Sequence, residues 1–319
     1  MGTAINRDTR IDFLKAIATL LVLNSHMGVC YKDYSFLATG GAIGDALFFF
    51  ASGFTLFLGR MDTFDNWYKR RIMRIFPTVF VVGLIAALFF GDNNSFLDII
   101  LCKQYWFIPT ILICYIPLYL IRRFFNGRQT VIAGLVYLML FGICFIILYD
   151  NHALFYGKNI LWRKFFYLSL MIFGAIVGKN KDRINWKPWM LLALIGSVFF
   201  FYILIYLLNG SSMQIVSSIP LMGISFCIYV LGDSRLIKRI DNNSFCGNLI
   251  YILGSICLES YLIQNYIISD SLNILFPLNI LIIAGLVLVS AYAIHMVSEI
   301  VRRIMDSKPF DWDGIILHR

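Results

Sequence analysis

The chain alternates between long apolar runs and short polar connections along nearly its whole length. The apolar runs are about 16–20 residues long, close to the length that a helix needs to cross the hydrocarbon core of a bilayer. Transmembrane β-strands are shorter and alternate in polarity, so these runs predict helices. We expect about ten spans, at residues 11–29, 41–59, 76–91, 105–121, 130–149, 162–178, 188–208, 215–231, 249–268 and 279–298. The predicted fold is an all-α, polytopic integral membrane bundle.

The composition supports this prediction and excludes a soluble globular domain. Of the 319 residues, 60% are hydrophobic and 14% are charged, and the mean hydropathy is +0.78. A soluble protein could not cover such a chain with polar side chains. The net charge of +9 is explained by cationic loops that orient a membrane protein, so we expect the lipid bilayer as a partner and no nucleic acid.

The Lys and Arg residues predict the topology of the chain. With the N-terminus in the cytoplasm, 22 of the 27 cations fall on the inner side, and the outer side holds Lys32, Lys103, Lys158, Arg163 and Lys164. Inner loops of membrane proteins are enriched in Lys and Arg, so both termini are predicted to be cytoplasmic. The first span has no cleavage site of a signal peptide and is interpreted as a retained anchor. We divide the chain into a transmembrane domain, 1–298, and a polar, cytoplasmic surface tail, 299–319.

Two titratable residues lie inside the first apolar run, RIDFLKAIATLLVLNSHMG. Lys15 and His26 are eleven residues apart, which on a helix is three turns plus about 20°, or about 16 Å along one face. Such groups are costly in lipid and usually face a cavity or a protein interior. We interpret Lys15 as the cytoplasmic mouth of a site and His26 as a general base deeper in it. The structural alternative is a snorkelling Lys and a hydrogen-bonded core His.

A second cluster, WYKRRIMRIFP, begins the third apolar segment and contains Arg70, Arg71 and Arg74. Cations at a cytoplasmic membrane edge set topology and contact lipid headgroups. They could equally hold phosphate groups, because guanidinium binds phosphate oxygens in bidentate fashion. Arg71 and Arg74, three residues apart, would project together from one helical turn.

Further candidates lie in three other spans. Ser52, in FFFASGF, is followed by Gly53, and this small pair would let a neighbouring helix or an acyl chain approach closely. Asp45, seven residues earlier, would be solvated at the outer side. Trp106, in WFIP, suits an aromatic anchor at the outer interface.

The ninth span contains LESYLIQN, and Glu259 lies deep in its apolar sequence. A buried carboxylate needs a partner or a cavity, and the candidates are Lys15, His26 and the Tyr261 hydroxyl. Near the inner end of the tenth span, His295 is interpreted as a residue of the membrane boundary. The chain has no Walker loop, GxGxxG, HExxH or Cys/His spacing typical of a metal site, so we predict no metal.

Four elements in this order resemble the membrane-bound acyltransferase 3 family of bacterial O-acyltransferases. They are the cation-x10-His element from Lys15 to His26, FFFASGF, RRIMRIFP and WFIP, all within the first ~110 residues. The resemblance implies cytoplasmic acyl-CoA, by default acetyl-CoA, as the donor substrate and a sugar hydroxyl as the acceptor. It implies catalysis by His26, with Lys15 as the cation of that element and Arg71 and Arg74 as the pair that holds the CoA phosphates.

Ser52, Gly53 and Trp106 match family positions with less defined roles. Relatives often carry a late His in a segment similar to SYxxYLxH, where this chain has Gln264 after Tyr261. The missing His shifts acid–base work to His26, with Glu259 as a helper, and leaves Ser52, Trp106, Tyr261 and Gln264 as candidate substrate contacts. An apolar residue is expected in the family at the position of Asp45.

The function predicted from these observations is a multi-pass O-acyltransferase of the bacterial inner membrane that modifies a cell-surface or exported glycan. The main alternative is a transporter or flippase for a lipid-linked glycan or another anion, which also needs buried charge and a cationic inner mouth. A third alternative is a structural subunit, which needs none of Lys15, His26 or Glu259. The sequence leaves open the acceptor, the oligomeric state and the choice between direct transfer and an acyl-histidine intermediate.

Overall fold

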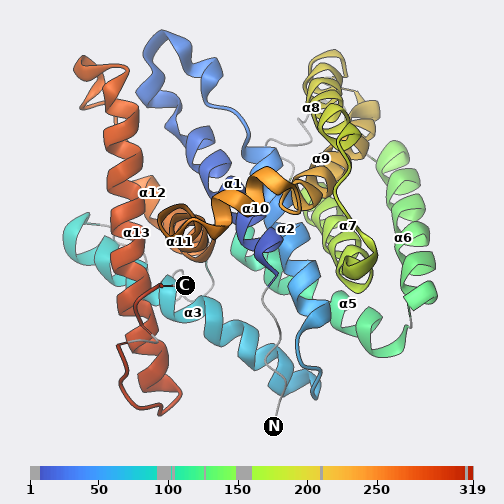
Figure 1. Ribbon diagram of the computed structural model, residues 1–319, viewed down its shortest axis with the longest axis horizontal. Coiled ribbons are helices and arrows are strands. Elements are labelled where there is room, and N and C mark those ends of the chain that lie inside the picture. Colours follow the sequence, from blue (N-terminus) through green and yellow to red (C-terminus); the bar gives the residue numbers. More distant parts are fainter. Residues whose placement is uncertain are drawn as a thin grey trace.

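The computed structural model of the chain describes residues 8–91, 102, 105–125, 127–148, 160–208, 211–312 and 315–318. This described part is helical and contains no β-strand, so the predicted all-α fold is confirmed. The α-helices (Figure 1) are α1 (Thr9–His26), α2 (Gly41–Leu58), α3 (Phe64–Phe89), α5 (Phe107–Phe124), α6 (Gly127–Leu148), α7 (Ile160–Lys179), α8 (Trp189–Leu207), α9 (Ser218–Leu231), α10 (Arg235–Asn242), α11 (Ser244–Ser255), α12 (Cys257–Ile267) and α13 (Leu278–Met305). Short 3-10 segments are η1 (Met27–Leu37), η2 (Lys181–Arg183), η3 (Ser212–Ser217) and η4 (Asn273–Leu275).

Within the described residues, eight helical segments are long and apolar enough to cross a membrane, and a ninth is added if α11 and α12 count together. The chain is therefore a multi-pass membrane protein. Each of the ten predicted segments overlaps a helix, and the segment 162–178, which is α7, is not among the eight. The predicted span over 249–268 corresponds to two helices, α11 and α12, which are bent by 73° at their junction. Lys103 and Lys158, used to predict topology, lie outside the described residues.

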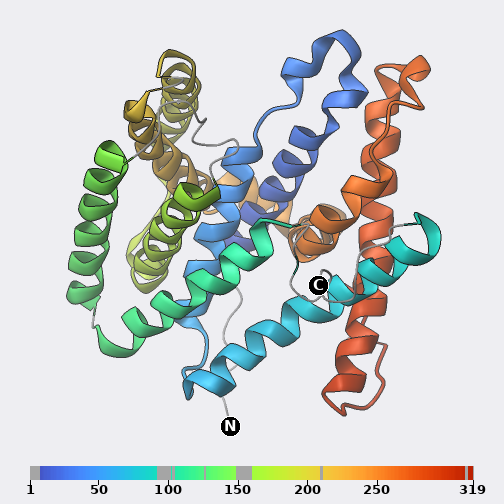
Figure 2. The same cartoon turned by 180° about the vertical axis from the view of Figure 1, so that it is seen from behind.

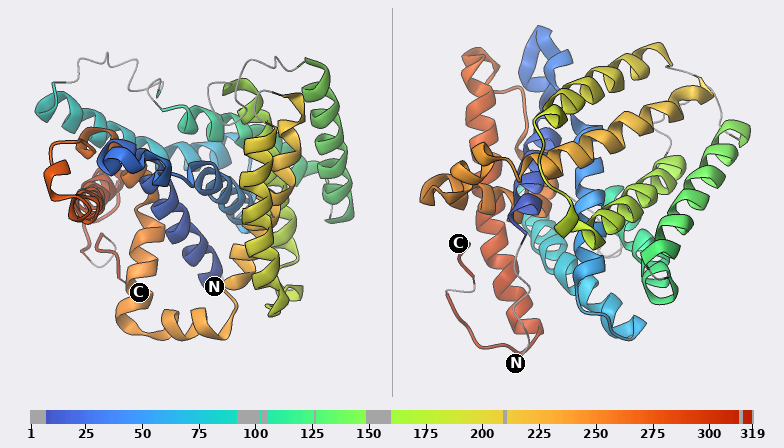
Figure 3. Two further views of the ribbon diagram at one scale, coloured as in Figure 1. Left: turned by 90° about the horizontal axis from the view of Figure 1, so that it is seen from above. Right: turned by 45° about the vertical axis from the view of Figure 1, so that its right-hand side comes forward.

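The helices form two groups on either side of α1 and α2 (Figure 3). On one side, α13 packs on α3 and α12, and α11 and α12 pack on α1. On the other side, α7 and α9 pack on α2, while α6 and α8 lie farther out. Viewed from behind in Figure 2, α3 and α5 cross the bundle as slanting helices, with α13 beside α3. The space between α1, α3, α12 and α13 is where the polar residues gather.

Two glycines allow α2 and α7 to pack at backbone contact. A Cβ atom at Gly53 would lie 1.9 Å from the carbonyl oxygen of Met171, and one at Gly174 would lie 2.1 Å from that of Phe50. Neither position could hold a larger residue without moving a helix. The close helix approach predicted for the Ser52-Gly53 pair is therefore present, and it fixes the face that α2 turns toward α1 and α5.

The peripheral helices α6 and α8 expose their apolar side chains. Only 11% of the most apolar window of α8 and 17% of that of α6 is buried inside the protein. Leu192 is 73% exposed and Ile147 is 72% exposed. Apolar surface of this extent is stable when lipid tails cover it.

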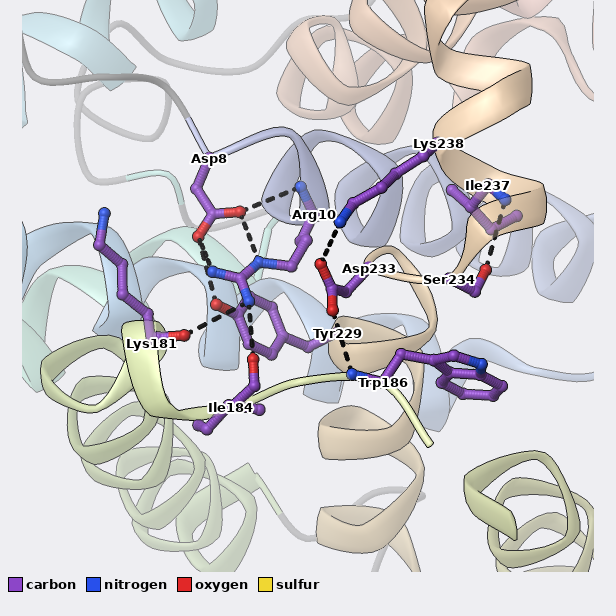
Figure 4. Close-up of polar contacts among 10 residues, drawn as sticks. All are labelled: Asp8, Arg10, Lys181, Ile184, Trp186, Tyr229, Asp233, Ser234, Ile237 and Lys238. Atoms are coloured by element: carbon purple, nitrogen blue, oxygen red, sulfur yellow. Dashed lines mark hydrogen bonds and ion pairs between the residues drawn. The ribbon is translucent and has the colours of Figure 1, made fainter. Parts of the chain in front are cut away.

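A polar cluster fixes the start of α1 (Figure 4). Asp8 caps the helix by accepting the backbone N–H of Arg10 at 3.1 Å. The Arg10 guanidinium donates to both carboxylate oxygens of Asp8, at 2.9 and 2.8 Å, and to the carbonyl oxygens of Lys181 and Ile184, at 3.4 and 3.3 Å. It also lies 4.6 Å from the ring centroid of Tyr229, whose hydroxyl donates to Asp8 at 3.2 Å. We call these five residues the α1 clamp.

Beside the α1 clamp, Asp233 joins the chain after α7 to the chain after α9. Its carboxylate accepts the backbone N–H of Trp186 at 3.0 Å and forms an ion pair with Lys238 at 2.6 Å (Figure 4). Partial burial raises the pKa of Asp233, but the Lys238 ammonium and the Trp186 N–H outweigh it, so the pKa lies below its ordinary value. The carboxylate is thus charged at neutral pH and holds these two connections beside α1.

The predicted surface tail has a different arrangement. Helix α13 continues to Met305, so its first residues are part of the bundle. The chain then turns back along the helix (Figure 1), with Ile315 1% exposed and Leu317 lining the cavity described below. The prediction of a polar surface segment is wrong for these two residues, because apolar side chains in an otherwise polar tail bury themselves against the nearest apolar wall.

Candidate active site

A cavity of about 540 Å³ lies between α1, α2, α3, α5, α11, α12 and α13. Six residues predicted from the sequence line it: Lys15, Ser52, Arg71, Arg74, Glu259 and Tyr261. Other polar residues that were not assigned to a site also line it, among them Asp45, Thr78, His295, Ser298, Glu299 and Arg302. The structure therefore brings together residues from both ends of the chain in one polar chamber.

Arg71 and Arg74 enter the cavity from α3, as their spacing predicted. Arg71 lies 5.2 Å from the ring centroid of Trp67, which is 1% exposed and fixes the guanidinium by a cation–π contact. Arg70 points away from the cavity and forms an ion pair with Asp62 at 2.7 Å. The expectation that all three arginines hold one ligand is not met, because adjacent helical residues differ by about 100° in direction.

Lys15 reaches the same cavity from α1. Beside Lys15, helices α1 and α11 touch closely: a Cβ atom at Gly254 would lie 2.7 Å from the carbonyl oxygen of Asp12. The hydroxyl of Thr19 donates to the carbonyl oxygens of Lys15 and of Leu253, at 3.0 and 3.1 Å, and so links α1 to α11. Among the described residues, no carboxylate forms an ion pair with Lys15, Arg71 or Arg74.

Glu259 is buried beside the bend between α11 and α12, and its side chain is 6% exposed. Its Oε1 atom accepts the Thr78 hydroxyl at 3.3 Å and lies 3.1 Å from His295 Nδ1. Its Oε2 atom is buried and has no hydrogen-bond partner in the described part of the chain. Interpreting His295 as a boundary residue was therefore wrong: its ring lines the cavity, with 19% of the side chain exposed, and it is the partner that Glu259 needed.

Tyr261 is in contact both with this cavity and with His26. The Tyr261 ring lines the cavity, and its centroid is 5.5 Å from Phe107, 6.0 Å from Tyr105 and 6.5 Å from His26. His26, the last residue of α1, meets the tyrosine edge-on and is exposed on the far side of it. Lys15 and His26 thus do not line one cavity, but Tyr261, which lines it, also contacts the imidazole of His26.

The remaining predicted contacts have different surroundings. Ser52 lines the cavity on α2, together with Asp45, which is not turned to bulk solvent as expected. Trp106 does not line it and stacks on Tyr167, with ring centroids 5.7 Å apart. Gln264 is 1% exposed, does not line the cavity, and its two amide atoms have no hydrogen-bond partner among the described residues.

The sequence patterns considered above did not identify a row of polar residues on one face of α13. His295, Ser298, Glu299 and Arg302 follow one another at helical spacing and line the cavity from α13, which packs against the α3 helix of Arg71 and Arg74. Residues three, four and seven positions apart share one helix face, so this pattern was the available signal. It was overlooked because these residues were assigned singly to the end of a span.

Comparison with known proteins gives one match. A family model described as an acyltransferase domain matches residues 8–297, nearly the whole chain. No curated protein and no solved structure matches the chain. The matched range contains the six predicted residues that line the cavity, and it includes His26 and His295.

Proposed function

Since the chain belongs to the acyltransferase 3 family and is a membrane acyltransferase, we propose that it transfers an acyl group, by default acetyl, from cytoplasmic acyl-CoA to a hydroxyl of a cell-surface or exported glycan. The proposed location is the bacterial inner membrane. The observation that carries the proposal is the cavity into which Lys15, Arg71 and Arg74 project with no described carboxylate to pair with them. Asp45, Glu259 and Glu299 line the same cavity, but the two glutamates form their ion pairs with other residues, so the three cations are able to bind an anion.

The donor fits this cavity by its chemistry. CoA ends in a phosphorylated nucleotide, which would bind Arg71 and Arg74 through bidentate hydrogen bonds to phosphate oxygens. Its pantetheine arm is long and uncharged, and would extend past Lys15 and Glu259 toward Tyr261. The thioester then lies on the cavity side of Tyr261, and the Tyr261 ring must turn aside before the thioester meets His26.

The reaction then needs one base. The imidazole of His26 takes the proton of the acceptor hydroxyl, and the hydroxyl oxygen attacks the thioester carbonyl carbon. The carbon–sulfur bond breaks, and the proton passes from His26 to the leaving thiolate, so that an ester and free CoA form. Transfer through an acyl-histidine has the same overall balance. The exposed side of His26 suits an acceptor that arrives from outside the cavity.

The two alternative functions, transport and a structural role, require different properties of the cavity. A transporter or flippase would bind an anion without breaking a thioester, and a structural subunit would need no cationic cavity. Neither is favoured by the match to an acyltransferase domain.

The test uses purified protein in detergent or nanodiscs with acetyl-CoA labelled in the acetyl group. We expect binding of the donor, release of free CoA, and label on a glycan acceptor or on water. Arg71→Ala should weaken donor binding in the same assay. A wild-type protein that binds no acetyl-CoA and cleaves no thioester would contradict the proposal and favour transport of another anion.

A further inference from the structure

A fourth cation, Arg302, lines the cavity from α13, a different helix from the one that carries Arg71 and Arg74. We propose that Arg302, oriented by Glu299, binds a phosphate group of the donor nucleotide. This inference rests on the proposed function, since it assigns a further binding residue to the same donor. The sequence alone placed Arg302 among the cations that set topology.

The position of Arg302 fits this role. It lines the cavity near the cytoplasmic end of α13, and 36% of its side chain is exposed. Arg71 and Arg74 line the cavity from α3, which packs against α13. A nucleotide that carries a diphosphate and a separate 3′-phosphate presents anionic groups in more than one direction, so cations from two walls suit it better than a pair from one helix.

Glu299 orients the guanidinium without consuming its binding capacity. The Arg302 Nη2 atom donates to Glu299 Oε1 at 2.6 Å. A guanidinium has five N–H donors, so this bond leaves others for a phosphate. The Glu299 carboxylate is 10% exposed and also lies 3.5 Å from Arg303, so one negative charge is shared between two positive ones. Arg302 therefore shares its carboxylate partner with Arg303, which leaves part of its charge available to a ligand in the cavity.

Arg303 provides a matched control. It follows Arg302 directly, has the same charge and contacts the same Glu299 oxygen. It does not line the cavity: its Nη1 atom donates to the carbonyl oxygen of Pro309 at 3.1 Å, and its Nη2 atom lies 3.8 Å from Asp311. Loss of either arginine removes one cation and one partner of Glu299, but only Arg302 faces the proposed ligand.

The experiment compares Arg302→Gln and Arg303→Gln in the full-length protein with three donors: acetyl-CoA, acetyl-dephospho-CoA, which lacks the 3′-phosphate, and S-acetylpantetheine, which lacks the nucleotide. For Arg302→Gln we expect KM for acetyl-CoA to rise about tenfold or more, because a charge-assisted hydrogen bond is lost. With S-acetylpantetheine the variant should match the wild type. The behaviour with acetyl-dephospho-CoA then shows which phosphate is bound: a lost effect identifies the 3′-phosphate, and a retained effect identifies the diphosphate.

Two results would overturn the inference. One is an equal rise in KM with all three donors, which is expected if Arg302 supports the fold or binds a lipid phosphate. The other is an equal effect of Arg303→Gln. Glu299→Gln tests the positioning role: KM for acetyl-CoA should rise less than in Arg302→Gln, kcat should stay unchanged, and the effect should again vanish with S-acetylpantetheine. Wild-type turnover of acetyl-CoA in the same series separates a failure of this inference from a failure of the proposed function.

Discussion

The α1 clamp and the cavity are both polar clusters within an apolar bundle, but they differ in how completely their hydrogen bonds are made. In the clamp, both carboxylate oxygens of Asp8 accept hydrogen bonds, and the Arg10 guanidinium donates through Nε, Nη1 and Nη2. In the cavity, Arg71 Nε, Glu259 Oε2 and Ser298 Oγ are buried without a partner in the described residues. Both clusters contain charges, so charge alone does not distinguish them.

This difference separates a structural role from a functional one. A fully satisfied network in a low-dielectric environment makes the fold rigid, whereas a partly satisfied one is costly unless something else uses it. The clamp lies at the first turn of α1, and Lys15, on the same helix, lines the cavity. The clamp thus holds the helix in place, and the cavity retains the unused capacity for a ligand. Four experiments would break or sharpen this comparison.

The largest effect is expected from His26→Ala, at a residue that does not line the cavity. A general base contributes about 10²–10⁴-fold to a rate, so kcat for acyl transfer should fall by that order. Donor affinity and thermal stability should stay close to those of the wild type, because His26 does not line the cavity and is exposed. Steady-state rates and acetyl-CoA binding measured on one preparation check both parts. A variant with wild-type turnover would show that the base is another residue.

Arg10→Ala should produce the largest loss of stability. The ion pair with Asp8 is largely buried, with 15% and 11% of the two side chains exposed. Removal of the Arg10 guanidinium leaves the buried Asp8 carboxylate without its counter-charge, which costs about 3 kcal/mol at such sites. Thermal unfolding in detergent measures the loss, with the exposed Arg235→Ala as the control. If Arg10→Ala unfolds at the wild-type temperature, the clamp does not stabilise the fold.

Arg71→Ala and Arg70→Ala form a matched pair that tests the cavity. The two residues are adjacent on α3, yet Arg71 lines the cavity and Arg70 pairs with Asp62 at the surface. The first variant should raise KM for acetyl-CoA about tenfold, which corresponds to one lost charge-assisted hydrogen bond. The second should leave KM unchanged. Equal effects would mean that the whole basic cluster acts through surface charge, as the topology interpretation holds.

The sequence predicted the helices well because hydropathy and length are local properties. It also placed Lys15, Arg71 and Arg74 correctly on faces that meet, since their spacing is set by the helix period. It failed where the answer depends on how helices are rotated or bent relative to each other. The 73° bend between α11 and α12 sets the course of α12, the helix that places Glu259 beside His295. Gly254 and Ser255, a pair typical of helix kinks, directly precede the bend, but they do not predict its direction.

The same dependence on helix packing explains why Lys15 and His26 do not line one cavity. The two residues share a helix face by spacing, but α1 ends at His26 and Tyr261 from α12 lies beside its ring. Whether a shared face lines one cavity or two depends on what packs against it. Such packing comes from residues far away in the sequence, here more than two hundred positions later.

Glu259→Gln should have the smallest effect on stability and tests the comparison most directly. The amide keeps an oxygen that can accept from Thr78 and His295, as Oε1 does now at 3.3 and 3.1 Å, and it removes a buried charge whose second oxygen is unpartnered. A neutral group is cheaper to bury than an ionised one, so the free energy of unfolding should stay within about 1 kcal/mol of the wild type. Asp8→Asn, the same change in the clamp, should destabilise clearly, because each oxygen of that carboxylate accepts from Arg10. If the two variants lose equal stability in parallel thermal unfolding experiments, then Glu259 and His295 are a structural pair like Asp8 and Arg10, and incomplete hydrogen bonding does not mark the functional site.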